Sequence, residues 1–153
     1  MNKIRITGGE PTVRKDFFDI IGTFEQLKVE MNNSGREITE LIFFGHEQSE
    51  SQSLTAFDIH NSYNSTDIDG IPFHYVLLQN GELQRGRPLG RIGEYSASHN
   101  NFSIGIVIPL VQDQKVSKAQ SRSLNGIIKT FYDVWPGGQL VDGQITDESN
   151  VDI

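Results

Sequence analysis

The side chains best suited to metal binding or acid–base catalysis in this sequence are four histidines, His46, His60, His74 and His99. Imidazole nitrogens bind zinc, and a catalytic zinc ion takes three protein ligands and keeps one position open for water. The chain has no cysteine, so neither thiolate ligands nor disulfides are available to it. A nucleophilic serine is not indicated, because no Gly-x-Ser-x-Gly elbow is present. Any catalytic or metal site would therefore have to be built from histidine and carboxylate side chains, positioned by the helices and strands of the fold.

The segment Thr7-Gly8-Gly9-Glu10-Pro11 resembles part of the radical S-adenosylmethionine enzymes, where a Gly-Gly-Glu-Pro stretch meets the amino group of the cofactor. Those enzymes hold an iron–sulfur cluster on cysteine thiolates. Because this chain lacks cysteine, we exclude that chemistry and expect no binding of the cofactor. Pro11 and Thr12 instead predict the start of a helix that continues to about Met31.

Composition narrows the class of protein. The chain has 153 residues with 20 acidic and 13 basic side chains, a formal net charge of -7. This length suits one domain with its own core. An acidic balance argues against a nucleic-acid partner, because phosphate binding requires positive charge. No apolar run approaches the roughly 18 residues that cross a membrane. No apolar segment of signal-peptide length follows Met1, so we expect no secretory signal.

Hydrophobic periodicity and turn signals divide the chain into elements. The predicted helices cover about 12–31, 54–63 and 117–135, and the predicted strands cover 38–44, 73–78, 82–85 and 104–109. Asn80-Gly81 indicates a hairpin, residues 85–101 a loop, and Ser117 with Gln120 a capping box. This order predicts an α/β fold with a single mixed central β-sheet flanked by helices. After residue 135 we expect only a short tail.

An ordered set of short motifs runs through residues 71–108. These are Phe73-His74-Tyr75, Asn80-Gly81, Gln84-Arg85-Gly86-Arg87, Gly93, His99-Asn100 and Ser103-Ile104-Gly105. In this order and spacing they resemble the type 2 N-acetylmuramoyl-L-alanine amidases, a family that includes phage lysozyme-type amidases and the peptidoglycan recognition proteins (PGRPs). The resemblance covers residues 38–153 and implies an amidase-like domain there. Residues 1–37 are then an N-terminal extension, with an extra helical segment, packed on that domain.

The resemblance also implies where a zinc site would lie. Enzymes of this family bind zinc through two histidines and a cysteine or aspartate and cut the muramoyl–L-alanine bond. Aligned without gaps, the ligand positions are Gly45, Gln144 and Asp152, and the assisting positions are Phe73, Tyr95 and Asn150. Glycine has no donor atom, and a glutamine amide is a poor zinc ligand. We therefore expect a degenerate site with no metal and no other cofactor.

His46 is the alternative first ligand, because it follows Gly45 directly. Using it would require the strand end to shift by one residue, which turns a side chain to the opposite face of a sheet. His74 alternates with Phe73 and Tyr75, so it should face away from the old cleft.

Two further groups of residues are expected at the surface, a vestigial cleft and a basic patch. The vestigial cleft should be lined by His46, Phe73, Tyr95, His99 and Asn100. Arg85, Arg87 and Arg91 form a basic patch that either contacts an anion or a partner or balances nearby acids.

Taken together, the resemblance and the lost ligands predict an inactive relative of the amidases. We expect a structural or partner-binding component of a phage particle, such as its tail or baseplate, with other protein chains as partners. The alternatives are a peptidoglycan-binding module and a zinc amidase with a displaced metal site. The expected location is a phage virion, otherwise the cytoplasm.

Overall fold

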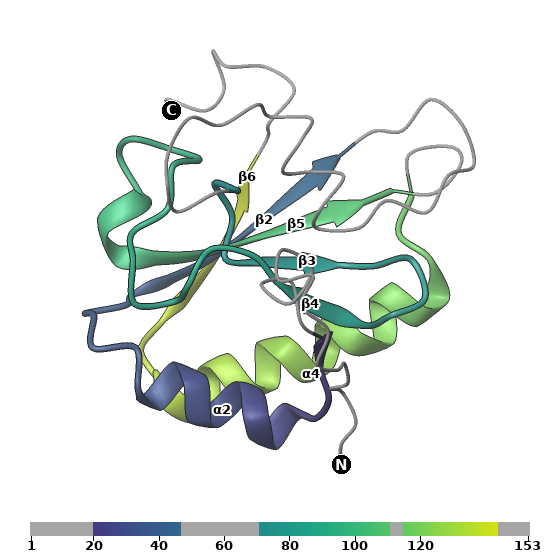
Figure 1. Cartoon of the computed structure of the whole chain (residues 1–153), viewed down its shortest axis with the longest axis horizontal. Coiled ribbons are helices and arrows are strands. Elements are labelled where there is room, and N and C mark those ends of the chain that lie inside the picture. Colours follow the sequence, from purple (N-terminus) through teal and green to yellow (C-terminus); the bar gives the residue numbers. More distant parts are fainter. Residues whose placement is uncertain (1–19, 47–70, 111–114, 144–153) are drawn as a thin grey trace, which may run out of the picture.

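The computed structural model describes residues 20–46, 71–110 and 115–143, which form one six-stranded sheet with two α-helices (Figure 1). The elements are β1 (Ile20–Ile21), α2 (Phe24–Asn32), β2 (Glu40–His46), β3 (Tyr75–Leu77), β4 (Leu83–Arg85), the 3-10 helix η2 (Asn100–Phe102), β5 (Ser103–Pro109), α4 (Lys118–Val134) and β6 (Gln139–Gly143). The strand order is β1-β4-β3-β5-β2-β6. Pairs around β5 and β2 are parallel, and pairs with β4 are antiparallel. The predicted α/β fold with a single mixed sheet is confirmed.

Both helices begin at a capping box. Thr23 and Ser117 each accept a hydrogen bond from the backbone N–H three residues later. The side-chain oxygen of the Gln at that position accepts one from the backbone N–H of the cap residue. These reciprocal bonds satisfy backbone donors that a helix start leaves unpaired. The box predicted at Ser117 is thus confirmed. Within the described residues, no helix is both long and apolar enough to cross a membrane.

The predicted helix 12–31 is wrong over residues 20–23. Ile20 and Ile21 form β1, which pairs with β4, and the helix begins only after Thr23. Two adjacent β-branched residues favour an extended backbone, and Gly22 separates them from the cap. Residues 12–19, like the predicted helix 54–63, lie outside the described part of the chain.

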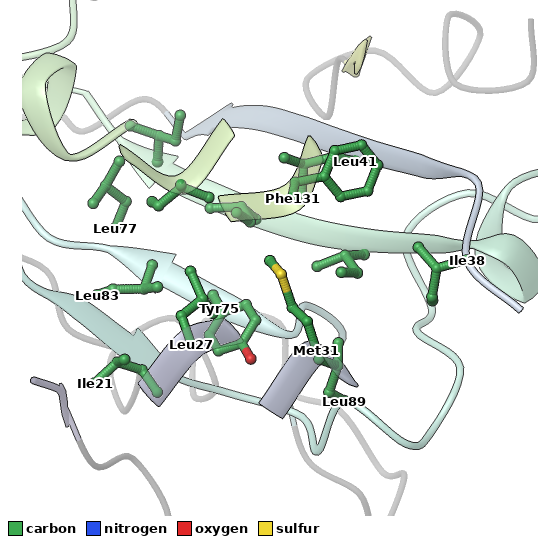
Figure 2. Close-up of a cluster of buried hydrophobic side chains, with 14 residues drawn as sticks. Ile21, Leu27, Met31, Ile38, Leu41, Tyr75, Leu77, Leu83, Leu89 and Phe131 are labelled. Carbon is green, nitrogen blue, oxygen red and sulfur yellow. The ribbon is translucent and has the colours of Figure 1, made fainter. Parts of the chain in front are cut away.

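The main core lies between the helices and one face of the sheet (Figure 2). From the helices come Leu27, Met31, Ile127 and Phe131, each at most 1% exposed. Sheet residues such as Leu41, Tyr75, Ile104 and Ile106 pack against them. We call this set the helix-side core. Because α2 contributes to it directly, this helix and the sheet share one apolar interior.

The hairpin between β3 and β4 has a three-residue loop, Gln79-Asn80-Gly81, because Leu77 pairs with Leu83 and the Leu78 N–H donates to the Glu82 carbonyl. Gly81 has φ +93°, a left-handed conformation that glycine adopts without strain. Asn80 accepts a hydrogen bond from the Glu82 N–H at 2.9 Å. The predicted hairpin is present, with one loop residue more than a two-residue Asn-Gly turn.

Residues 139–143, expected as part of a tail, form β6 and run parallel to β2. Only Leu140 and Val141 are apolar in this strand, and it lies at the edge of the sheet. An edge strand buries little, so its sequence needs no strong apolar pattern.

Candidate functional site: the sheet face opposite the helices

The face of the sheet that points away from α2 and α4 carries a second buried cluster. It contains Ile42, Phe44, Ile71, Phe73, Val76, Tyr95 and Val107. In β2, side chains alternate between the two cores: Leu41 belongs to the helix-side core and Ile42 to this one. We call the second cluster the aromatic face. Its rings lie close together, with centroids of Phe44 and Phe73 5.2 Å apart and those of Phe73 and Tyr95 stacked at 5.8 Å.

Phe73 and Tyr95, both predicted cleft residues, therefore meet on this face. Phe73 is 1% exposed and has no polar atom to offer a reacting group. The Tyr95 hydroxyl lies 2.7 Å from Ser103 Oγ and donates to the Ser103 carbonyl at 3.1 Å. Burial raises the pKa of Tyr95 to about 12. This phenol is thus protonated near neutral pH and already engaged within the fold.

Gly45 and His46 face opposite sides of the sheet. A Cβ atom built on Gly45 would lie 3.0 Å from Leu110 Cδ1, and Leu110 packs against the helix-side core. The alternation of β2 then places His46, which is half-buried, on the aromatic face with Ile42 and Phe44. The two residues thus lie on opposite faces, as the one-residue step between them implies. His46, and not Gly45, occupies the position from which a side chain reaches that face.

His99 and Asn100, expected in the same cleft as His46, lie at the other end of β2. His99 Nδ1 is 2.7 Å from an oxygen of Glu40, the first residue of β2, whereas His46 is the last. Six residues of strand separate them, about 20 Å at 3.3 Å per residue. Asn100 Oδ1 accepts hydrogen bonds from the backbone N–H groups of Tyr95 and Ser96. Asn100 thereby shapes the loop that delivers Tyr95 to the aromatic face.

His74 is completely buried between the sheet and residues 91–105. Its Nδ1 accepts from the Gly105 N–H at 3.1 Å, so Nε2 carries the proton and donates to the Arg91 carbonyl at 2.7 Å. Burial lowers the pKa of His74 to about 3. Its ring packs edge-on against Tyr95, with centroids 5.8 Å apart. This neutral imidazole is a structural bridge and has no nitrogen left for a metal.

Sequence reasoning missed Arg36, which closes the loop before β5. Its guanidinium donates to the carbonyl oxygens of Leu89 (3.1 Å), Asn100 (3.0 Å) and Ser103 (3.0 Å). Burial lowers the pKa of Arg36 from its ordinary value. A lone arginine in a turn carries no motif, so only the three-dimensional arrangement could reveal this role.

The three arginines expected to form a basic patch have different surroundings. Arg85 forms an ion pair with Glu30 of α2, which also accepts a 2.7 Å hydrogen bond from Tyr75. Arg87 is 3% exposed and donates to the carbonyls of Ile71 and Ile92 and to Glu94, each at 3.0 Å. The Arg91 side chain is exposed. The guanidinium groups of Arg85 and Arg87 therefore bind carboxylates and carbonyls of the chain itself.

Within the described residues, the aromatic face presents few donor groups of the kind that zinc prefers. Three ligands of imidazole, thiolate or carboxylate type must converge on the ion, and β2 presents one, His46. Among residues 20–46, 71–110 and 115–143, no three His, Asp or Glu side chains come together closely enough to hold a metal ion. Gln144, Asn150 and Asp152, the other positions that the resemblance marks, lie outside the described residues.

Comparison with known proteins gives similarity in structure but not in sequence. No protein-family model matches the chain, and no curated protein matches it. Among solved structures, it is similar to the endolysin N-acetylmuramoyl-L-alanine amidase LysCS from Clostridium intestinale, with a TM-score of 0.59, 18% identity and coverage of 71% of this chain and 70% of that one. The chain is also similar to the amidase LysC from the same organism, with a TM-score of 0.59, 18% identity and coverage of 71% of this chain and 72% of that one.

A third similar structure is PGRP-Hd from Alvinella pompejana, with a TM-score of 0.56, 18% identity and coverage of 77% of each chain. Since all three identities are low, these similarities establish the fold alone. The chain has an amidase/PGRP-like α/β fold.

Proposed function

We propose that this chain is a non-catalytic amidase-fold module, which acts by binding a partner and does not cleave a bond. The observation that carries the proposal is the make-up of the aromatic face. Packed apolar side chains fill it, and β2 contributes a single imidazole, that of His46, to it. An amidase of this fold would need further donor groups at the same place.

The chemistry of hydrolysis supports this proposal. Bulk water, with a pKa near about 15.7, is a very weak nucleophile at neutral pH unless a metal or a base activates it. Phe73 supplies no acid or base, and the Tyr95 hydroxyl is hydrogen-bonded to Ser103. Gln144 and Asn150 replace the histidine and lysine that the resemblance leads one to expect.

The partner that we propose is another protein chain, in a phage particle such as its tail or baseplate. This step is an analogy: a wall-hydrolase fold without its catalytic groups can be reused as a building block, since fold does not determine function. Peptidoglycan is the second candidate partner, and the structural similarity to a PGRP favours it.

Metal content and cleavage together test the loss of catalysis. Protein purified without added metal should contain far less than one zinc per chain, and it should release no peptide from muropeptides, with or without added zinc, by mass spectrometry. About one zinc per chain, lost together with cleavage when a chelator is added, would overturn the proposal and make His46 a ligand.

Sedimentation with purified peptidoglycan separates the two partner classes. A protein-binding module should remain in the supernatant, as a non-binding control protein does. Retention by the pellet, and its competitive release by soluble muropeptide, would replace the protein partner with peptidoglycan while leaving the non-catalytic character intact.

A further inference from the structure

Helix α4 carries an apolar stripe that the sheet covers only in part. Leu124, Ile128, Tyr132 and Trp135 follow one another at spacings of four, four and three residues, so they share one side of the helix. Tyr132 is 37% exposed, and the other three are half-buried. The rings of Tyr132 and Trp135 both contact that of Phe131, which is fully buried. The stripe is therefore the open margin of the helix-side core.

The opposite side of α4 already has a neighbour. There, Phe24 of α2 packs over Gly126, and Lys28 of α2 forms an ion pair with Asp133 at 4.0 Å. The apolar stripe thus faces away from α2, whereas the two helices cover each other along the other flank (Figure 1).

The stripe continues onto the edge of the sheet. Leu140 of β6 pairs in register with Leu41, so both lie on the helix side of the sheet, and Leu140 is 41% exposed. Phe43, the next residue of β2 on that side, is half-buried against the same core. We call the combined area the α4–β6 surface; it consists of Phe43, Leu124, Ile128, Tyr132, Trp135 and Leu140.

Charges of opposite sign border this surface. Lys118, Arg122 and Lys129 lie along the solvent-facing side of α4, and all three are exposed. Asp142 pairs in register with Phe43 and is exposed at the edge of the sheet. No ion pair within the described residues involves any of these four side chains.

We propose that the α4–β6 surface associates with the same surface of a second copy of this chain. In an isologous dimer each copy uses the same patch. A two-fold axis along α4 sets the basic flank of one copy against Asp142 of the other, so the charge pattern is complementary to itself. The charged residues that border the surface are of both signs, and the protein has a net charge of -7. Nucleic acids and anionic membranes bind surfaces that are uniformly positive, so neither is a suitable partner here. The surface is on the opposite side of the sheet from the aromatic face, so this inference does not rest on the proposed function.

Sedimentation velocity of the full chain over a wide concentration range tests the proposal. We expect a monomer–dimer equilibrium. The variants Tyr132→Glu and Leu140→Glu should each raise the dissociation constant at least tenfold, because they place a charge in the apolar contact. Val29→Glu is the matched control: Val29 is 54% exposed on α2, outside the surface, and its substitution should leave the dissociation constant unchanged. Circular dichroism confirms that each variant is folded.

A charge exchange tests the orientation. Lys129→Glu and Asp142→Lys should each weaken the dimer, and the two together should restore it. A chain that remains monomeric at all concentrations overturns the proposal, including one that instead binds anionic lipid vesicles. A dimer that is insensitive to Tyr132→Glu and Leu140→Glu, or a double charge exchange that fails to restore association, overturns it as well.

Discussion

At the scale of single residues, the Arg36 guanidinium closes the loop between β4 and β5 against the sheet. Its three shortest hydrogen bonds, each 3.0–3.1 Å long, go to the backbone carbonyls of Leu89, Asn100 and Ser103. Hydrogen bonds from charged groups contribute about 1.5–3 kcal/mol each, and unpaired buried carbonyls are costly. Arg36→Met should therefore lower the free energy of unfolding by about 3 kcal/mol, measured by urea denaturation. The control Arg122→Met, at an exposed position, should change it by less than about 0.5 kcal/mol.

The buried His74 predicts a pH dependence of stability. Its pKa is about 3 in the folded chain, against about 6.5 in an unfolded one. As pH falls below about 6.5, the unfolded state gains a proton that the folded state excludes until pH nears 3. Stability is thus retained above 6.5 and lost below it, by up to about 1.4 kcal/mol per pH unit.

The matched variant is His74→Gln, which removes the titrating group. It should be less stable at neutral pH because its buried hydrogen bonds change, yet its unfolding free energy should fall less steeply than that of the parent between about pH 6.5 and 4. Equal slopes in urea denaturation at several pH values would show that another group controls the acid sensitivity.

The facing of Gly45 and His46 leads to a prediction about zinc. Gln144→His would leave His46 and Asp152 unchanged. It would give three donors, His46 on the aromatic face and residues 144 and 152, which are two of the ligand positions that the family resemblance marks. We expect this variant to take up zinc, measured by elemental analysis after dialysis. Gly45→His is the control: its imidazole would point toward Leu110 on the helix side, so it should add no zinc. Uptake by the control alone would contradict the facing of β2 described above.

At the scale of elements, two adjacent isoleucines of α4 differ in how far they are buried. Ile127 is fully buried in the helix-side core, whereas Ile128 is half-buried on the open margin of α4. Ile127→Ala should cost about 3 kcal/mol of unfolding free energy, and Ile128→Ala clearly less, because truncation cost grows with the cavity left behind. Similar costs at both positions would show that Ile128 is covered as completely as Ile127.

The elements also show how far sequence reasoning reaches. Helix α4 was predictable because a capping box and an apolar stripe coincide, and β5 because residues 104–109 are an almost unbroken apolar run. The facing of residues 45 and 46 was not predictable. Leu41 to Phe44 are all apolar, since both faces of β2 are covered, so no polar alternation marks either side. The distance between His46 and His99 depends on where the loop joins the sheet, which no local pattern records.

At the scale of the whole molecule, α2 decides whether residues 38–153 can stand alone. Leu27 and Met31 are at most 1% exposed, and Glu30 joins Tyr75 and Arg85 of the sheet. Fully burying such side chains contributes about 1.5–3 kcal/mol each, a large share of a total stability of about 5–15 kcal/mol.

A chain that begins at residue 38 should therefore lack a cooperative thermal transition by circular dichroism. Val29→Ala in the full chain, at a position 54% exposed, is the control and should melt as the parent does. A cooperative transition in the shortened chain would show that the predicted boundary at residue 37 is a true domain boundary.

The position of β2 in the sheet has a consequence for the newly made protein. This apolar strand pairs with β5, which begins at Ser103, and with β6, which ends at Gly143. At synthesis rates of about 5–20 residues per second, the ribosome needs roughly 5–20 s after completing β2 to supply both partners. Until β5 is complete at Pro109, Leu41, Ile42 and Phe44 have neither neighbouring strand, and until β6 is complete at Gly143 they still lack the second one. The nascent chain is then exposed to aggregation, and slower translation would lengthen this period while chaperones that bind extended apolar segments would protect it.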